Sequence, residues 1–352
     1  MSIVIDQESK TRASHTQRTA RSQNGKSFVN VQPPSLNDNA KSIAVNIASV
    51  SLANPLEDIA DELGRSFAEN GFAVVRDHGI AQDLIDRAEA MSKAFFALPE
   101  PVKKAYAIKG GGGARGYTPF GTEKAKDAQV FDLKEFWHVG RDLPAGHALA
   151  EFMAPNIWPG EVEGFRETFS ELFAAFETAG ERVLEAIALH LGLARDYFAP
   201  TIEDGNSVMR LLHYPPLGPD APEGAIRAAA HGDINTITLL LGAEEAGLQL
   251  LAKDGQWHAV DVPEGALVIN VGDMLERLTA GKLVSTTHRV VNPAGEAATR
   301  SRFSMPFFLH FRPDFMIEPL ESCVAEMGVS SAQPPISAHD FLMQRLREIN
   351  LA

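Results

Sequence analysis

Residues 231–241 read HGDINTITLLL, a polar His-x-Asp pattern that leads directly into a β-rich apolar run. Similar short runs lie before and after it, separated by Gly, Pro or Asp residues. Runs that are rich in β-branched and aromatic residues and bounded by turn residues predict strands. The predicted strands are 208–214, 234–241, 248–251, 258–262, 266–271, 284–291 and 303–311. Several short strands of this kind are typical of a sandwich, a barrel or a jelly roll.

Helical patterns lie mainly on the N-terminal side of these strands. Apolar residues with a helical period begin after Asn54-Pro55, an N-cap and N1 pair, and end at Gly71. The same period predicts further helices over 84–96, over 164–192 with a buried aromatic stripe, and over 338–349. Two more strands are expected over 43–50 and 72–75. We therefore expect a mixed α and β fold in which helices pack around the outside of a β core.

The composition excludes several classes of partner. The chain has 352 residues and a formal net charge of -14, so its surface repels phosphate backbones and anionic membranes. The one cysteine, Cys323, excludes an internal disulfide and a cysteine-rich metal site, and it fits a reducing, cytoplasmic setting. No apolar run reaches the ~20 residues of a transmembrane helix, and the N-terminus lacks the apolar stretch of a secretory signal. We expect a monomer or a weak homo-oligomer with no nucleic-acid or membrane partner.

Four parts of the chain differ in character. Residues 1–41 are polar and net basic, and they bury too little apolar surface to fold, so we expect a flexible tail. Residues 42–200 are mainly helical, residues 201–320 hold most of the predicted strands, and residues 321–352 carry the last helix. The residues suited to chemistry gather in the third part.

The candidate metal ligands are His231, Asp233 and His288. Side chains at positions i and i+2 of an extended segment share a face, so His231 and Asp233 can reach one metal ion. His288, within the run STTHRV, adds a second imidazole from another strand. Two histidines and one carboxylate on one side of the metal form the ligand set of non-haem Fe(II) oxygenases. A His-x-Asp pattern alone is weak evidence, because turns often contain Asp.

A second group of residues is suited to binding a carboxylate. Arg302 and Ser304 share one face of a predicted strand, and a guanidinium beside a hydroxyl can hold a carboxylate bidentately. Tyr214, at the end of the run 208–214, can donate a further hydrogen bond to the same acid. The alternative is an ordinary edge-strand arginine beside a solvent-facing serine, and Arg300 competes with Arg302 for the role.

Arg210 is the least settled candidate. It shares a strand face with Leu212 and Tyr214, so we expect its guanidinium to enter the barrel. A buried guanidinium needs an anionic partner. That partner is either a substrate carboxylate or a neighbouring Glu, and both alternatives stay open.

Five ordered motifs together resemble the isopenicillin N synthase-like branch of the Fe(II)/2-oxoglutarate-dependent dioxygenases. The N-terminal runs FAENGFAVV over 67–75, HGI over 78–80 and FFALP over 95–99 are similar to the same family, as are Lys103-Lys104 and Gly116-Tyr117. The resemblance covers roughly residues 42–320 and is specific where each motif alone is not. The five motifs are Met209-Arg210 with Tyr214-Pro215-Pro216, His231-x-Asp233, Asn270-Val271-Gly272-Asp273, Thr287-His288-Arg289-Val290 with Asn292-Pro293, and Arg302-x-Ser304.

The resemblance implies a double-stranded β-helix, a distorted jelly roll, with iron on His231, Asp233 and His288. It further implies that 2-oxoglutarate chelates the iron while its 5-carboxylate meets Arg302 and Ser304, that O2 is the other cosubstrate, and that succinate and CO2 are released. A small-molecule substrate is then hydroxylated, desaturated or cyclised. The family's substrate wall lies at the barrel opening and on N-terminal loops, which makes candidates of Tyr117, Phe120, Phe136, Arg210 and Phe308.

Two departures from the family pattern matter. Plant members often have Asn-Tyr-Tyr where this chain has Leu212-His213-Tyr214, so only Tyr214 carries over. The link from His288 to Arg302 is longer than expected, and Gly295–Thr299 reads as a lengthened hairpin. Two rival functions remain: an iron oxidase on the same scaffold that does not consume 2-oxoglutarate, and an inactive β-helix that only binds a ligand.

Overall fold

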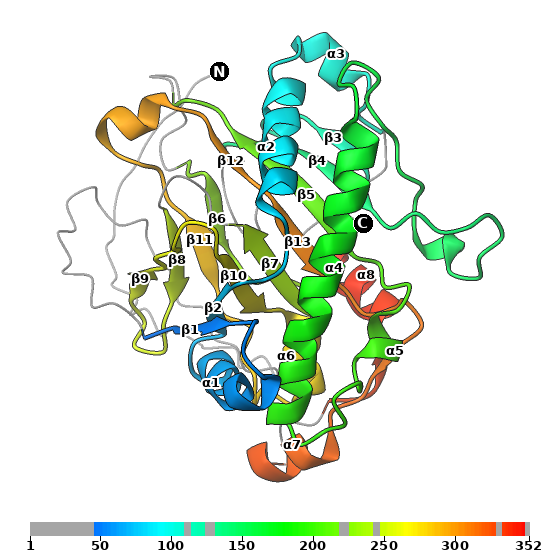
Figure 1. The fold of residues 1–352 in the computed structure, drawn as a ribbon, viewed down its shortest axis with the longest axis vertical. Helices are drawn as coiled ribbons and strands as arrows, with labels where there is room; N and C mark the ends of the chain where they lie inside the picture. Colours follow the sequence, from blue (N-terminus) through cyan, green and yellow to red (C-terminus); the bar gives the residue numbers. More distant parts are fainter. Residues whose placement is uncertain are drawn as a thin grey trace, which may run out of the picture. The chain divides into compact units, whose positions relative to one another are not determined.

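Two β-sheets face each other across a shared apolar core, and helices cover the outer face of the larger sheet (Figure 1). The computed structural model describes residues 46–108, 114–123, 131–217, 225–241, 247–328 and 333–348. The strands are β1 Ala48–Ser51, β2 Phe72–Arg76, β3 Gly116–Thr118, β4 Glu135–Gly140, β5 Val208–Tyr214, β6 Ala228–His231, β7 Ile237–Leu241, β8 Leu248–Leu251, β9 Trp257–Ala259, β10 Leu267–Val271, β11 His288–Val290, β12 Arg302–Ser304, β13 Pro306–Leu309, β14 Met316–Ile317 and β15 Ile336–Ser337. The α-helices are α1 Leu56–Glu69, α2 Gln82–Phe96, α3 Glu100–Lys104, α4 Phe165–His190, α5 Ala199–Ile202, α6 Asp273–Leu278, α7 Glu321–Met327 and α8 Ala338–Glu348, and the 3-10 turns are η1 Ala150–Phe152 and η2 Gly295–Thr299.

The larger sheet runs in the order β1-β2-β10-β7-β13-β5-β4-β3, and β12 also pairs with β5. The smaller sheet runs in the order β6-β11-β8-β9. Every pairing within these two sheets is antiparallel except that of β1 with β2. A cluster that includes Phe72, Val268 and Leu250 fills the space between the sheets. Because side chains alternate along a strand, Arg210 and Tyr214 of β5 face this inner space.

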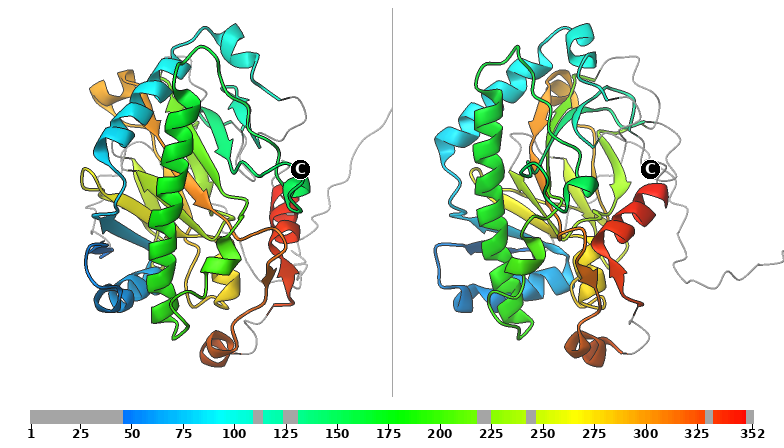
Figure 2. Two further views of the ribbon diagram at one scale, coloured as in Figure 1. Left: turned by 45° about the vertical axis from the view of Figure 1, so that its right-hand side comes forward. Right: turned by 90° about the vertical axis from the view of Figure 1, so that its right-hand side faces the viewer.

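Helix α4 crosses the outer face of the larger sheet, beside α1 and α2 (Figures 1 and 2). It buries the aromatic stripe that the sequence predicts, and Phe176 stacks on Phe307 of β13 with ring centroids 5.2 Å apart. Each such buried Phe contributes roughly 2 to 3 kcal/mol of transfer free energy. Gly180 allows the close approach, because a Cβ atom there would lie 2.4 Å from Leu309 Cδ1.

The predicted mixed fold with a β core and outer helices is confirmed, and β5 and α4 match their predicted ranges closely. Other predicted ranges need correction. The run 303–311 divides at Met305 into β12 and β13, and only three residues of the run 284–291 form β11. The short helix α6 and the strands β3, β4 and β6 were not predicted.

Two of the missed strands have clear physical reasons. Every residue of β4, EFWHVG, is buried, so the strand lacks the alternation that marks a half-exposed strand. Strand β6, AAAH, consists mostly of alanine, a weak strand former. The strands β1 to β4 also show that the N-terminal part of the chain contributes to the larger sheet and is not purely helical.

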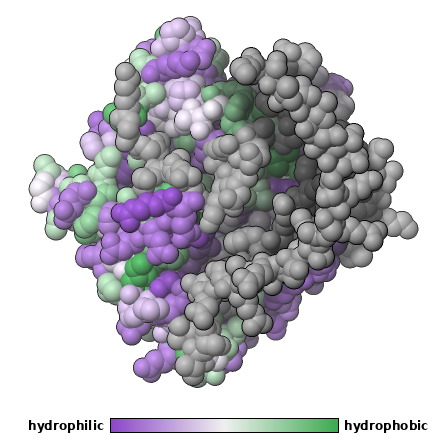
Figure 3. Space-filling view, turned by 180° about the vertical axis from the view of Figure 1, so that it is seen from behind, coloured by the Kyte–Doolittle hydropathy of each residue, from purple (hydrophilic) through white to green (hydrophobic). Residues whose placement is uncertain are grey.

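The predicted tail over 1–41 and the residues Ile43 and Val45 lie outside the described residues. Within the described ranges, no helix is both long and apolar enough to cross a membrane. On the face in Figure 3, hydrophilic and hydrophobic side chains of the described residues are intermingled.

Candidate active site

The predicted metal ligands meet at the ends of two paired strands. Strand β6 ends at His231 and β11 begins at His288, and these residues lie opposite each other in the antiparallel ladder. Their ring centroids are 4.5 Å apart. Asp233 follows two residues after His231, and its Oδ1 lies 3.9 Å from Nε2 of each histidine. The candidate ligand atoms of the three side chains all lie within 4.8 Å of one another.

Hydrogen bonds orient both imidazole rings. His231 Nδ1 donates to the carbonyl of Ala229 at 2.7 Å, and His288 Nδ1 donates to the carbonyl of Thr286 at 3.2 Å. A neutral imidazole carries one proton, so in each ring Nε2 is the atom with a free lone pair. Backbone acceptors of this kind are the usual partners of histidines that bind metals.

The carboxylate is oriented in the same way. Asp233 Oδ2 accepts hydrogen bonds from the Thr238 hydroxyl and, at 2.8 Å, from Asn270 Nδ2, which leaves Oδ1 facing the histidines. Burial alone would raise the pKa of Asp233, but His288 and His231, together with these hydrogen bonds, hold it below its usual value. Burial, and then the neighbouring His288, lower the pKa of His231 below its usual value. An ionised carboxylate and neutral imidazoles are the forms that bind metal, so these residues fit Fe(II).

The candidate carboxylate-binding residues also come together. The pairing of β12 with β5 places Arg302 opposite Tyr214, and its Cζ lies 5.1 Å from the centroid of that ring. Arg302 Nη1 donates to Ser304 Oγ at 3.4 Å, and all three residues are buried. Arg300 is exposed and follows the turn η2, which lengthens the link from β11 to β12. The arrangement therefore favours Arg302 over Arg300.

One arginine beside this group was not predicted. Arg227 is fully buried, and its Cζ lies 5.8 Å from the centroid of the Tyr214 ring. Its Nη2 donates to the carbonyl of Arg300 at 3.3 Å. Arg227 directly precedes β6, and the register of β6 against β11 shifts between Ala228 and His231. Simple strand alternation therefore does not identify Arg227 from the sequence.

Three of the candidate substrate residues form one cluster on the inner face of the larger sheet. The Arg210 Cζ lies 4.2 Å from the ring centroid of Phe136 and 5.4 Å from that of Phe308. Arg210 Nη1 donates to both carboxylate oxygens of Glu123, at 3.1 and 3.2 Å, and Nε donates to His138 Nε2 at 2.6 Å. The partner of Arg210 in this structure is therefore a neighbouring Glu.

A buried ionic network continues from this cluster toward the candidate metal ligands. Lys134 Nζ lies 2.8 Å from the carboxylates of both Glu123 and Asp132. Burial alone would lower the pKa of Lys134, but these two carboxylates raise it, so the ammonium group stays charged. Asp132 Oδ1 accepts a hydrogen bond at 3.0 Å from the backbone of Ala229, the residue whose carbonyl orients His231. No periodic pattern marks these residues in the sequence.

The other two candidate substrate residues have different surroundings. Tyr117 lies opposite Trp137 in the ladder of β3 and β4, packs in the core beneath the helices, and donates its hydroxyl to Glu135. Phe120 is 45% exposed, and its ring packs edge-on against Phe131 with centroids 5.8 Å apart. The structure groups neither of them with the cluster around Arg210.

Comparisons with known proteins agree with this geometry. Residues 45–161 match the family model of the non-haem dioxygenase in morphine synthesis N-terminal region, and residues 205–311 match that of the 2OG-Fe(II) oxygenase superfamily. The chain is 34% identical over 293 residues to the 2-oxoglutarate-Fe(II) type oxidoreductase hxnY of Emericella nidulans, and the match covers 81% of this chain and 82% of that protein.

Solved structures support the same assignment. A 2OG-Fe(II) oxygenase family protein from Caulobacter crescentus is 54% identical with a TM-score of 0.79, over 86% of this chain and 99% of that chain. A Neurospora crassa protein in complex with alpha-KG and thymine is 27% identical with a TM-score of 0.76, over 86% of this chain and 96% of that chain.

A two-sheet core that brings two histidines and an aspartate together defines the class of non-haem iron oxygenases. The chain belongs to the 2OG-Fe(II) oxygenase superfamily and is a 2-oxoglutarate-dependent dioxygenase. The predicted family, jelly-roll fold, oxidoreductase class, Fe(II) and 2-oxoglutarate are thereby confirmed. When bound, iron and 2-oxoglutarate supply the oxidising chemistry with O2.

Proposed function

We propose that His231, Asp233 and His288 bind the iron, and that Arg302 and Ser304, with Tyr214, bind the 5-carboxylate of 2-oxoglutarate. The convergence of Asp233 Oδ1 with the two Nε2 atoms carries this proposal, because hydrogen bonds already occupy the other polar atom of each ligand. The buried guanidinium of Arg302, beside the hydroxyl of Ser304 and the ring of Tyr214, supports the second part of the proposal. Such a group binds a carboxylate with charge-assisted hydrogen bonds.

The prime substrate would lie between the iron and the Arg210 cluster. Phe308 pairs with Thr238, the residue that holds Asp233, so the cluster and the metal ligands share one inner wall. Substrate bound against the rings of Phe136 and Phe308 would therefore present a C–H bond to the iron. Hydroxylation, desaturation and ring closure are all compatible with this position.

We further propose that the group of the substrate that meets Arg210 is a neutral acceptor such as a carbonyl. Glu123 already compensates the charge of Arg210 at 3.1 Å, and a substrate carboxylate would add an unpaired negative charge beside it. Thymine, which is bound in the Neurospora crassa complex, is a neutral ring with carbonyl groups and supports this class. Tyr117 and Phe120 are not part of the proposal.

The remaining predictions concern the setting of the protein. We propose a cytoplasmic enzyme, monomeric or weakly self-associating, that acts on a free small molecule without a nucleic-acid or membrane partner. The net charge of -14 and the single cysteine support this. We also retain the division into a tail over 1–41, a mainly helical part over 42–200, a catalytic part over 201–320 and a C-terminal segment over 321–352.

A substrate screen scored by succinate release tests the proposed chemistry. The panel consists of small cyclic compounds in matched pairs, each a carboxylic acid and its primary amide. Neutral members are expected to stimulate succinate release from 2-oxoglutarate, and their acids are expected to do so less. Stimulation by the acids alone would contradict the neutral-acceptor proposal, and no succinate with or without substrate would contradict the assignment of the iron and cosubstrate residues.

A further inference from the structure

We propose that His213 is a positioning residue for the cosubstrate, because it holds the residues on both sides of Arg302. The inference rests on the proposed function of Arg302 as the ligand of the far carboxylate of 2-oxoglutarate. His213 does not face the inner space of the barrel. It lies on the opposite face of β5 from Tyr214, within hydrogen-bond distance of Glu135 in β4 and of Ser301 just before β12.

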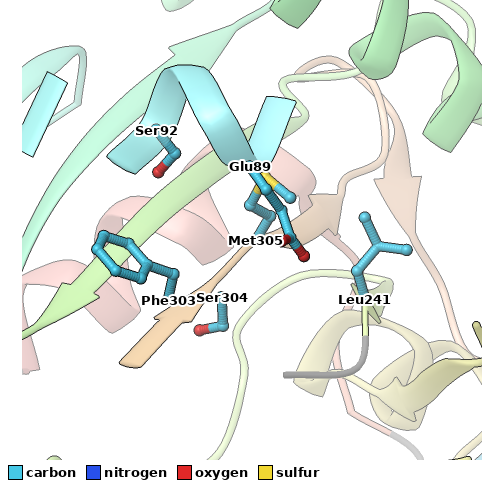
Figure 4. Close-up of a pocket in the computed structure, with 6 residues that line it drawn as sticks. All are labelled: Glu89, Ser92, Leu241, Phe303, Ser304 and Met305. Carbon is cyan, nitrogen blue, oxygen red and sulfur yellow. The ribbon is translucent and has the colours of Figure 1, made fainter. Parts of the chain in front are cut away.

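The strand that carries Arg302 is short and has one strand neighbour in the described part of the chain. Strand β12 is three residues long, and within the described residues it pairs only with β5. The chain then breaks its strand at Met305 before β13 begins. A small cavity lies between helix α2 and this break (Figure 4). The cavity is lined by Glu89, Ser92, Leu241, Phe303, Ser304 and Met305.

His213 adds side-chain contacts on the outer face of β12, beside those that Phe96 and Lys93 of α2 make with Phe303. In the ladder of β5 and β12 it lies opposite Phe303, and the two rings stack at 14° with centroids 4.7 Å apart. Its Nε2 lies 3.0 Å from the hydroxyl of Ser301. Ser301 and Phe303 are the residues immediately before and after Arg302. One side chain therefore holds both chain neighbours of the arginine.

His213 is itself held from the other side. Its Nδ1 donates to Glu135 Oε1 at 2.7 Å, and Glu135 lies opposite it in the ladder of β4 and β5. Glu135 also accepts hydrogen bonds from Lys103, at 2.8 Å to each oxygen, and from Tyr117. With Nδ1 as donor, the neutral ring presents Nε2 as the acceptor for the Ser301 hydroxyl. A buried carboxylate with this many donors is a rigid anchor, so the ring has one orientation.

This network connects the helical part of the chain to the cosubstrate residues. Lys103 lies in α3 and Tyr117 in β3, whereas Ser301 and Arg302 lie about 190 residues later in the chain. A guanidinium that forms two parallel hydrogen bonds to a carboxylate tolerates little displacement, since a misplacement of about 1 Å can cost about a hundredfold in rate. Loss of the His213 contacts should therefore weaken the interaction at the far carboxylate and leave the metal end of the cosubstrate unaffected.

The test compares two 2-oxo acids that differ only at the far end. Anaerobic protein loaded with Fe(II) is titrated with 2-oxoglutarate and with 2-oxovalerate, which lacks the 5-carboxylate, and the visible charge-transfer band reports binding. In His213→Phe, which keeps the stacked ring and removes both hydrogen bonds, we expect the dissociation constant of 2-oxoglutarate to rise by about tenfold. The value for 2-oxovalerate should stay within about twofold of wild type, because it does not use Arg302.

Ser301→Ala provides a milder change that removes one hydrogen bond and leaves Glu135 with all its donors. It should raise the dissociation constant of 2-oxoglutarate by roughly threefold to tenfold and leave that of 2-oxovalerate nearly unchanged. This variant decides the question if His213→Phe does not fold. His258→Phe is the matched control. His258 lies in β9 of the smaller sheet, is similarly buried, and is also paired with a carboxylate, that of Asp254 at 3.1 Å. It should change neither constant.

Two results would overturn the role of His213. One is an unchanged 2-oxoglutarate constant in both His213→Phe and Ser301→Ala, and the other is an equal loss for both oxo acids, which indicates general disruption. A different result would show that Arg302 does not bind the far carboxylate of 2-oxoglutarate. In that case Arg302→Lys also leaves the 2-oxoglutarate constant unchanged, or wild type binds both oxo acids equally well.

Discussion

Arg302→Lys separates charge from geometry at the cosubstrate site. The substitution keeps a positive charge but removes the planar fork, so one of two charge-assisted hydrogen bonds to the carboxylate is lost. A hydrogen bond of that kind in a buried site contributes about 1.5 to 3 kcal/mol, and Arg302 is only 4% exposed. With about 1.4 kcal/mol for each factor of ten, 2-oxoglutarate should bind roughly tenfold to 150-fold more weakly. Anaerobic titration of the Fe(II) protein, followed by its charge-transfer band, measures this change.

Arg300→Lys is the natural control for this experiment. Arg300 is exposed and two residues away, so its substitution should change the affinity by no more than about twofold. Ser304→Ala removes a neutral hydroxyl and should cost about 0.5 to 1.5 kcal/mol. Unchanged affinity in Arg302→Lys together with a large loss in an Arg300 variant would show that the wrong arginine had been assigned.

Three further predictions concern the metal, the substrate wall and pH. Asp233→Ala should retain less than about a tenth of the wild-type Fe(II) after gel filtration, and stoichiometric iron by metal analysis would contradict the ligand assignment. Arg210→Gln should lower stability by about 1.5 to 3 kcal/mol because it removes the charge-assisted hydrogen bonds to Glu123, which keeps Lys134 as its other cationic partner, and it should reduce substrate-stimulated succinate release while preserving the 2-oxoglutarate band; wild-type stability and turnover would refute both roles. Burial lowers the pKa of His310 to about 4, so the unfolded chain takes up a proton first as pH falls below about 6.5. Metal-free protein should therefore lose roughly 3 kcal/mol of stability between pH 7 and pH 4 through this group, and His310→Leu should flatten that part of the urea-unfolding profile; an identical slope in the variant would exclude His310 as the cause.

The sequence could single out the three candidate metal ligands because part of their geometry is local. The spacing of His231 and Asp233 implies a shared face in any extended segment, and His288 lies in a strand with a clear apolar pattern. Strand β5 was predicted over its full range for the same reason. What the local pattern does not contain is the pairing of β6 with β11, which places His231 opposite His288.

The surroundings of the site depend on pairings between distant segments. Lys134, which directly precedes β4, and Arg210 of β5 both contact Glu123. The pairing of β4 with β5 brings these segments together, and β4 has no alternation to reveal it. The position of His213 stands out in the sequence, because plant members often have another residue there. Its partners Ser301 and Glu135 belong to two other parts of the chain, so the local sequence does not reveal them. Sequence periodicity predicts which face a side chain occupies, whereas the neighbours on that face follow from the topology.

We propose that His231, Asp233 and His288 bind the iron to which 2-oxoglutarate attaches. The most direct measurement is the anaerobic visible spectrum of the protein with Fe(II) and 2-oxoglutarate, recorded for wild type, His231→Ala and His288→Ala. We expect a weak charge-transfer band in wild type and its absence in both variants, with circular dichroism showing that both remain folded. A band of wild-type intensity in either folded variant would show that the altered histidine is not a ligand of the iron.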